Sequence, residues 1–113
     1  MVSEETRQAL LSFRREREWE QFHSPKNLAI AISIEAAELL EEFRWTAGNG
    51  LEEGVSRAGV ERELADVLIL SLYLAHDLGV DLNALVRSKL EANAVKYPVD
   101  VSRGKARPES SAL

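Results

Sequence analysis

The sequence contains no cysteine among its 113 residues. This absence excludes disulfide bonds, thiolate zinc sites and cysteine nucleophiles. Aromatic residues make up only 6% of the chain and there are three prolines, whereas hydrophobic residues make up 45% and charged residues 29%. Such a balance is typical of a folded globular protein rather than a disordered one. A chain of this length is expected to form one domain around one small core.

An excess of basic residues is also lacking, since 14 lysines and arginines stand against 19 acids and give a net charge of −5. A nucleic-acid polymer is therefore a disfavoured partner, although a small phosphorylated ligand held through a metal ion is not. The longest apolar runs are too short to span a membrane, and the first residues, MVSEETRQ, contain no apolar signal region. We therefore expect a cytoplasmic protein with no membrane partner.

Helical periodicity and capping residues predict an all-α fold of four helices. Ser24 followed by Pro25 is a typical helix start, whereas Gly79 and then Asp81 indicate one helix end and the next helix start. The expected helices span residues 3–20, 25–45, about 56–78 and 82–96. We expect one domain over residues 1–98 and a flexible tail over residues 99–113, because Tyr97-Pro98 stops the last helix and the tail has little to pack against.

The second and third predicted helices are apolar on nearly every side. Residues 28–34 and 67–74 consist mostly of leucine, isoleucine, valine and alanine. A helix with this pattern is buried on several sides or is covered by another subunit. Because a lone four-helix domain of this size has too little interior for both helices, we expect antiparallel helices in a homo-oligomer.

Two acidic pairs lie within these apolar helices, Glu35-x-x-Glu38 and Glu63-x-x-Asp66, and 24 residues separate them. The i, i+3 spacing places both carboxylates of a pair on one side of a helix. Ionised carboxylates are costly in apolar surroundings unless a cation or hydrogen bonds compensate. Four such acids therefore predict a shared cation site, and hard oxygen ligands without cysteine or histidine favour Mg²⁺.

Other interpretations of these acids remain open at this point. Acids at i, i+3 are common as ordinary surface charge, and a single pair would favour that interpretation. A redox di-iron bundle normally needs Glu-x-x-His pairs, whereas the corresponding positions here are Glu38 and Asp66. A carboxylate cluster that holds Mg²⁺ suits phosphate chemistry, because the ion neutralises phosphoryl oxygens and positions a water.

Three segments together make the chain resemble the MazG-like all-α nucleoside triphosphate pyrophosphohydrolases, and within them the dCTP pyrophosphatase branch. The first segment is the acidic pattern itself, in which Glu63 to Leu70 is similar to the branch sequence EELSDVLIY. The second is FRxERxWEQFHSPKN from Phe13 to Asn27, and the third is SKxxxNxxKYP from Ser88 to Pro98. The resemblance covers roughly residues 13–98.

The resemblance implies Mg²⁺-dependent hydrolysis of a deoxynucleoside triphosphate, with dCTP as the first choice, between the α and β phosphates. Manganese is a possible substitute for magnesium. The four acids match the family's metal ligands and catalytic residues, and we select Glu38 as the one that orients or deprotonates the attacking water. The resemblance also implies an assembly of at least two subunits, often a tetramer built as a pair of dimers, and a role in cleaning or balancing the nucleotide pool.

Substrate contacts are expected from residues in the two flanking segments and at the end of the second helix. Planar aromatic side chains offer stacking faces for a base, and lysine is a common phosphate ligand. Core packing of the aromatic residues and a solvated basic face are the alternative interpretations. The candidates are Trp19, His23, Lys26, Asn27, Trp45, Lys89, Asn93, Lys96 and Tyr97.

Leu70 departs from the family pattern, because dCTP-type relatives often carry tyrosine at that position. Leucine keeps an apolar wall but loses the ring and the hydroxyl group, so the base preference is open. A second hypothesis for the whole chain is a non-catalytic nucleotide-binding or helical interaction module with the same fold. The intact acidic pairs favour the enzyme.

Overall fold

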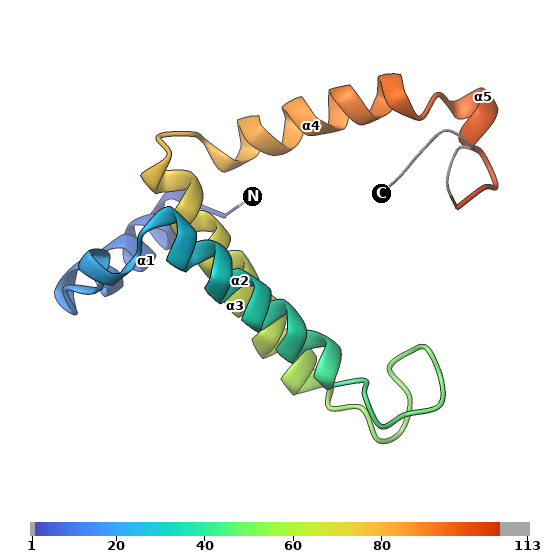
Figure 1. The fold of residues 1–113 in the computed structure, drawn as a ribbon, viewed down its shortest axis with the longest axis horizontal. Helices are drawn as coiled ribbons and strands as arrows, with labels where there is room; N and C mark the ends of the chain where they lie inside the picture. Colours follow the sequence, from blue (N-terminus) through green and yellow to red (C-terminus); the bar gives the residue numbers. More distant parts are fainter. Residues whose placement is uncertain (1, 107–113) are drawn as a thin grey trace. The chain divides into compact units, whose positions relative to one another are not determined.

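The computed structural model describes residues 2–106, and these residues form helices and connecting turns without a strand (Figure 1). The all-α expectation is thereby confirmed for the described part of the chain. The chain divides into two compact units, the first ending at Gly79 and the second beginning at Val80. Residues 107–113, which belong to the predicted flexible tail, lie outside the described residues.

The first unit contains three helices and a short 3₁₀ helix. They are α1 (Glu4–Glu16), η1 (Trp19–Phe22), α2 (Pro25–Glu41) and α3 (Arg57–Asp77). Helices α2 and α3 run antiparallel side by side along most of their length (Figure 1). This pairing places the start of α2 beside the end of α3, where α1 also packs.

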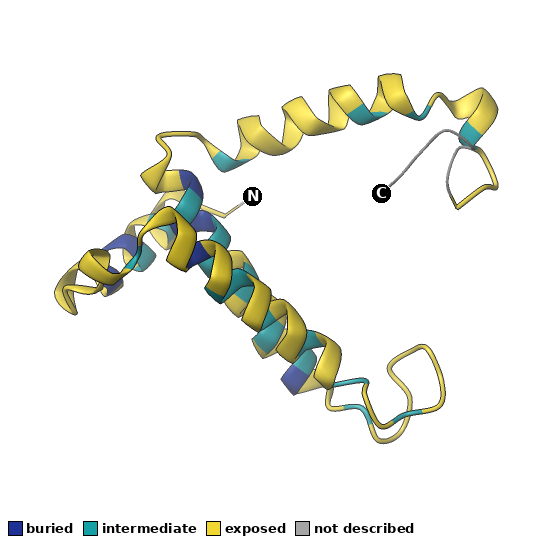
Figure 2. Ribbon diagram, viewed as in Figure 1, coloured by how far each residue is buried: buried dark blue, intermediate teal, exposed yellow. Residues whose placement is uncertain are grey.

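The buried core lies at that end of the α2–α3 pair, where α1 meets both helices (Figure 2). Its buried hydrophobic members are Leu11 on α1, Leu28 on α2, and Leu72 and Tyr73 on α3. At the other end of the pair, the carboxylate of Glu42 lies directly against Gly59.

Capping side chains begin α2 and α3 where the sequence indicates. The Ser24 hydroxyl accepts a hydrogen bond from the Asn27 backbone N–H at 3.1 Å, and Pro25 occupies the first turn. The Ser56 hydroxyl likewise accepts from the Gly59 N–H at 3.0 Å. Both bonds satisfy donors that a helix start leaves free. Gly79 follows α3 with a φ angle of 72°, the left-handed conformation that glycine adopts without strain.

Two predicted helix ends are wrong. The first helix stops at Glu16 rather than Glu20, because Glu18 takes a left-handed φ angle of 55° and the chain re-forms as η1. The second stops at Glu41 rather than Trp45, because i→i+3 hydrogen bonds from Phe43 and Arg44 tighten the backbone into turns. The reversal after Glu16 places Trp19 edge-on to Phe13, with ring centroids 5.7 Å apart.

The second unit contains α4 (Leu82–Lys96) and the short α5 (Val99–Ser102). Asp81 caps α4 by accepting a hydrogen bond from the Ala84 N–H at 3.0 Å, as the sequence predicts. Helix α5 was not predicted, since residues 99–102 were assigned to the tail. The proposed domain boundary at residue 98 remains a prediction.

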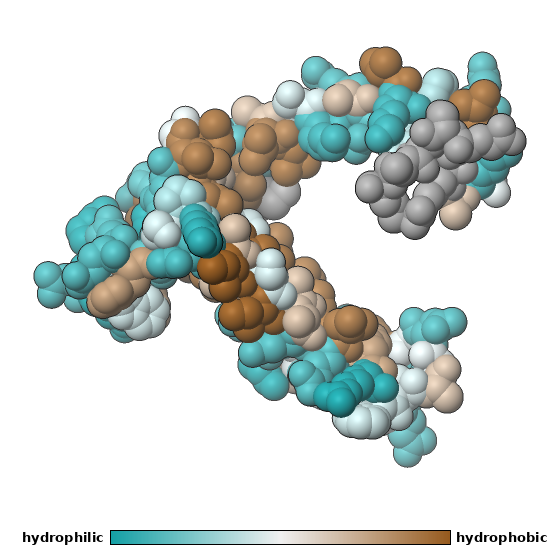
Figure 3. Space-filling view, in the orientation of Figure 1, coloured by the Kyte–Doolittle hydropathy of each residue, from teal (hydrophilic) through white to brown (hydrophobic). Residues whose placement is uncertain are grey.

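Many large hydrophobic side chains are exposed on the helices of both units. On the first unit, Ile30 and Ile34 on α2 and Leu64 and Leu68 on α3 are each about half exposed. Figure 3 shows hydrophobic surface along this helix pair. Among the described residues, no helix is both long enough and apolar enough to cross a membrane.

Candidate metal and nucleotide site

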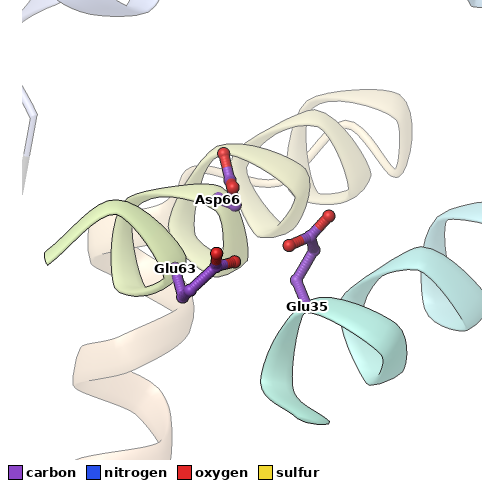
Figure 4. Close-up of side chains that lie close together, drawn as sticks. All are labelled: Glu35, Glu63 and Asp66. Atoms are coloured by element: carbon purple, nitrogen blue, oxygen red, sulfur yellow. The ribbon is translucent and has the colours of Figure 1, made fainter. Parts of the chain in front are cut away.

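Glu35, Glu63 and Asp66 form a carboxylate cluster between α2 and α3. Glu35 projects from α2 toward Glu63 and Asp66, which lie one turn apart on α3 (Figure 4). One carboxylate oxygen from each residue lies within 4.8 Å of the others. The antiparallel pairing of the two helices therefore converts two distant sequence pairs into one acidic site.

Glu38, the fourth predicted ligand, lies beside this cluster rather than within the group of three. Interaction with its carboxyl group raises the pKa of both Glu35 and Glu63. Its side chain is exposed, whereas those of Glu35 and Glu63 are half-buried. Glu38 is thus near enough to perturb both carboxyl groups and has access to solvent.

The cluster is electrostatically unfavourable without a cation. The hydrogen bond with Glu38, then burial, then the hydrogen bond with Glu63 raise the pKa of Glu35 from 4.5 to about 7. Burial, followed by contact with Glu38, raises the pKa of Glu63. Like charges and desolvation both disfavour ionised carboxylates. The protein therefore holds its acidic groups in a place where only a positive partner would keep all of them charged.

The available oxygen atoms fit a divalent metal ion. The Oε2 atoms of Glu35 and Glu63 are buried and have no hydrogen-bond partner. Buried polar atoms usually have partners, so two neighbouring carboxylate oxygens without one require an explanation. An oxygen-only donor set of carboxylates suits Mg²⁺ or Mn²⁺. The cluster of Glu35, Glu63 and Asp66 can thus hold such an ion.

A cavity of about 350 Å³ adjoins the acidic cluster. Its size falls within the range of small-ligand sites. Glu35 and Asp66 line one part of it, and the rest of its wall is mainly apolar and aromatic. The other lining residues are Leu10, Phe13, Trp19, His23, Ile69, Leu70 and Tyr73. This arrangement places charged oxygens and a planar, apolar compartment side by side in one unit.

Trp19 and His23 are the predicted substrate-contact residues that line the cavity. They lie there because η1 turns the chain back against α1, and the next residue, His23, contacts Tyr73 on α3. The centroids of the His23 imidazole and the Tyr73 ring are 5.7 Å apart, and the two ring planes are inclined by 33°. Burial, and then the nearby Arg14 charge, lower the pKa of His23 below its usual 6.5. The imidazole is therefore neutral at physiological pH.

Lys26, Asn27 and Trp45 are not among the cavity-lining residues. Lys26 and Asn27 occupy the exposed first turn of α2, where the Asn27 amide donates to the Phe22 carbonyl at 3.1 Å. Trp45 is 82% exposed beyond the end of α2, with the Arg44 guanidinium 4.4 Å from its ring centroid. Their substrate contacts remain predictions.

The remaining candidates belong to α4 and its end, in the second unit. Lys89, Asn93 and Lys96 follow i, i+4, i+7 spacing and share one face of α4. Tyr97 ends the helix, and the Lys96 ammonium lies 5.4 Å from its ring centroid. Their contacts with phosphate and base remain predictions.

Tyr73 is a cavity residue that the sequence reasoning missed. The expected tyrosine position, 70, carries leucine, and the ring appears three residues later on the same side of α3, where Leu70 also lines the cavity. The signal was available, since Asp66, Leu70 and Tyr73 follow i, i+4, i+7 spacing. Phe13 and Leu10 were missed as cavity residues because their contribution depends on how α1 docks against α3.

Comparison with known proteins identifies the family of the chain and a solved structure with a similar fold. The MazG-like family model matches residues 30–107. A solved structure of a pyrophosphatase from Archaeoglobus fulgidus is similar with a TM-score of 0.77 and 45% identity, covering 84% of this chain and 91% of that one. The chain belongs to the MazG-like family.

Two curated relatives have the same name. The dCTP pyrophosphatase 1 of Rattus norvegicus is 42% identical over 107 residues, which are 91% of this chain and 63% of that protein. The Homo sapiens protein of the same name is 42% identical over 108 residues, covering 92% and 64%. The chain therefore spans about 63% of the length of these relatives. The family expectation from the sequence is confirmed.

Proposed function

We propose that this protein hydrolyses deoxynucleoside triphosphates, dCTP first among them, between the α and β phosphates. The observation that carries the proposal is the carboxylate cluster of Glu35, Glu63 and Asp66 at the wall of an aromatic cavity. A triphosphate with a planar base needs both parts, one for charge and one for the base. The names of the relatives support the same activity.

In the proposed reaction, the four acids would hold Mg²⁺, and the bound ion would neutralise charge on the phosphoryl oxygens. Glu38, exposed beside the cluster, orients a water molecule and accepts its proton. The water oxygen bonds to one of the two phosphorus atoms that flank the α–β bridging oxygen. The bond between that phosphorus and the bridging oxygen breaks, and the bridging oxygen leaves with the other phosphate group. The products are a nucleoside monophosphate and pyrophosphate.

In this proposal the cavity binds the base, and the apolar faces of α2 and α3 form the contacts between subunits. Trp19 and the neutral His23 contact the base, with Leu70 as an apolar wall that permits relaxed selectivity. Lys89, Asn93 and Lys96 on α4 contact the phosphates. The exposed apolar residues of α2 and α3 are covered by further copies of the chain in a homo-oligomer, a tetramer built from two dimers. A cytoplasmic role in cleaning or balancing the nucleotide pool belongs to the same proposal.

The test is an identification of products. Each deoxynucleoside triphosphate is incubated with the protein and Mg²⁺, and the phosphate products are separated by ion-exchange chromatography. Monophosphate with pyrophosphate is the expected result, and release of single phosphates would contradict the proposal. If nucleotide binds without turnover, the non-catalytic binding module is correct instead.

Asp66→Asn provides the matched variant for that assay. It removes a charge without removing volume, so we expect turnover to fall by roughly two orders of magnitude or more while the helical content stays unchanged. Glu61→Gln, an exposed acid on the same helix outside the cluster, is the control and should retain activity. Full activity of Asp66→Asn would show that the ligand assignment is wrong.

A further inference from the structure

Arg14 is the only buried charged residue among residues 2–106, with 2% of its surface exposed. Its guanidinium forms two parallel hydrogen bonds with Asp77, from Nη1 to Oδ2 at 2.9 Å and from Nη2 to Oδ1 at 2.7 Å. This bidentate pair joins α1 to the last residue of α3. Two donors in a fixed plane define the orientation of the guanidinium as well as its position.

The oriented guanidinium lies over the ring of Tyr73, with Cζ 4.6 Å from the ring centroid. The Tyr73 hydroxyl donates a hydrogen bond to the Leu10 carbonyl at 2.8 Å. Tyr73 is 3% exposed, so its ring is held by a cation on its face, a hydrogen bond at its tip and the core around it. The ring has no alternative position without breaking these contacts.

His23 depends on that ring for its own placement. Its Nδ1 atom is buried and has no hydrogen-bond partner, so no bond at that atom fixes the imidazole. The ring contact with Tyr73 is its remaining directional contact in the first unit, and both residues line the cavity. A displacement of Tyr73 would therefore move the imidazole within the cavity wall.

We infer that Arg14 is a positioning residue for the cavity: with Asp77 it fixes Tyr73, and Tyr73 fixes the His23 imidazole that faces the ligand. The part of this inference that concerns substrate rests on the proposed function. The part that concerns His23 is a property of the protein alone. Arg14 does not line the cavity, so it acts through Tyr73 and His23, which do.

The cost of burying Arg14 supports a role beyond stability. Its Nε atom is buried without a partner, which adds a desolvation penalty that the Asp77 pair does not remove. Buried ion pairs are often no more stabilising than apolar residues of similar volume, and some of them fix one arrangement among several. Replacement of Arg14 is therefore expected to disorder the cavity wall and to have a smaller effect on the free energy of unfolding.

The test uses Arg14→Leu, Arg14→Lys and the control Arg15→Leu, an exposed arginine on the same helix. For Arg14→Leu we expect KM for dCTP to rise about threefold to tenfold with kcat within about twofold of the wild type. Lysine keeps the charge but not the planar fork, so Arg14→Lys should recover only part of the loss. Arg15→Leu should behave as the wild type.

The His23 imidazole signals in an NMR spectrum of the substrate-free protein give the second readout. They should shift or broaden in Arg14→Leu, because the ring beside the imidazole moves, and remain in place in Arg15→Leu. Unchanged His23 signals and unchanged KM in folded Arg14→Leu would overturn the inference. If Arg14→Leu does not fold, Asp77→Asn decides on the same two readouts, since it keeps the volume and removes the charge. Absence of hydrolysis by the wild type would refute the proposed function, whereas the NMR result would still decide the role of Arg14.

Discussion

At the scale of single residues, the raised pKa of Glu35 indicates how metal binding should depend on pH. Without metal, contact with Glu38 and burial raise its pKa to about 7, above the ordinary 4.5. Between these two pH values the folded protein binds a proton at Glu35 that the unfolded chain has released. The stabilisation that this proton gives to the folded state is therefore lost as pH rises from 4.5 through about 7. Metal binding needs the ionised form and becomes stronger over the same interval.

We expect the rise in melting temperature caused by Mg²⁺ to be larger at about pH 8 than at about pH 6. Thermal unfolding with and without MgCl₂ at both pH values measures this difference. Glu35→Gln cannot ionise at that position and should reduce both the Mg²⁺ effect and its pH dependence. An equal Mg²⁺-induced shift at the two pH values in the wild type would mean that Glu35 is not a ligand.

At the scale of helices, the cap of α2 links stability to the cavity. The Ser24 hydroxyl satisfies the Asn27 N–H, and the preceding residue, His23, lines the cavity. We expect Ser24→Ala to lower the free energy of unfolding by about 1 kcal/mol, measured by urea denaturation. Ser33→Ala on the same helix is the matched control, because its exposed hydroxyl only donates to the Ala29 carbonyl. It should have less than half the effect, since alanine is the better helix former. Equal losses would show that the cap contributes nothing specific.

The helices also show what the sequence could predict and what it could not. The bounds of α3 and α4 were predicted within a few residues because caps at Asp81 and Gly79 are local signals. The end of α1 was missed because Glu18 adopts a left-handed backbone that its residue type does not indicate. The reversal brings η1 back against α1, where Trp19 contacts Phe13.

The same distinction applies to the site. The carboxylate cluster was predictable because both acidic pairs share helical spacing and lie in apolar runs, so an antiparallel pair brings them together. The cavity was only partly predictable, because Tyr73 and Phe13 enter it through the docking of α1 against α3. The Arg14–Asp77 pair spans 63 positions in the sequence and had no local signal.

At the scale of the whole molecule, the exposed apolar residues predict self-association. Ile30 on α2 is 48% exposed, and Leu64 and Leu68 on α3 are similarly exposed. Monomers rarely expose large apolar patches, and closed symmetric assemblies cover such surfaces. Sedimentation analysis at about ten micromolar protein should therefore detect a dimer or tetramer, and a monomer would contradict the proposed assembly.

Ile30→Glu tests whether this particular surface is the one that associates. A charge introduced into an apolar interface must be desolvated without a partner, so the variant should shift the equilibrium toward monomer by at least about tenfold in dissociation constant. Asn49→Asp, in the exposed loop after α2, adds the same charge outside the helix pair and should leave the assembly unchanged. If both variants sediment as the wild type does, the subunits associate through another surface. Position 30 is separate from the acidic pair at positions 35 and 38, so a change in assembly can be compared directly with any change in turnover.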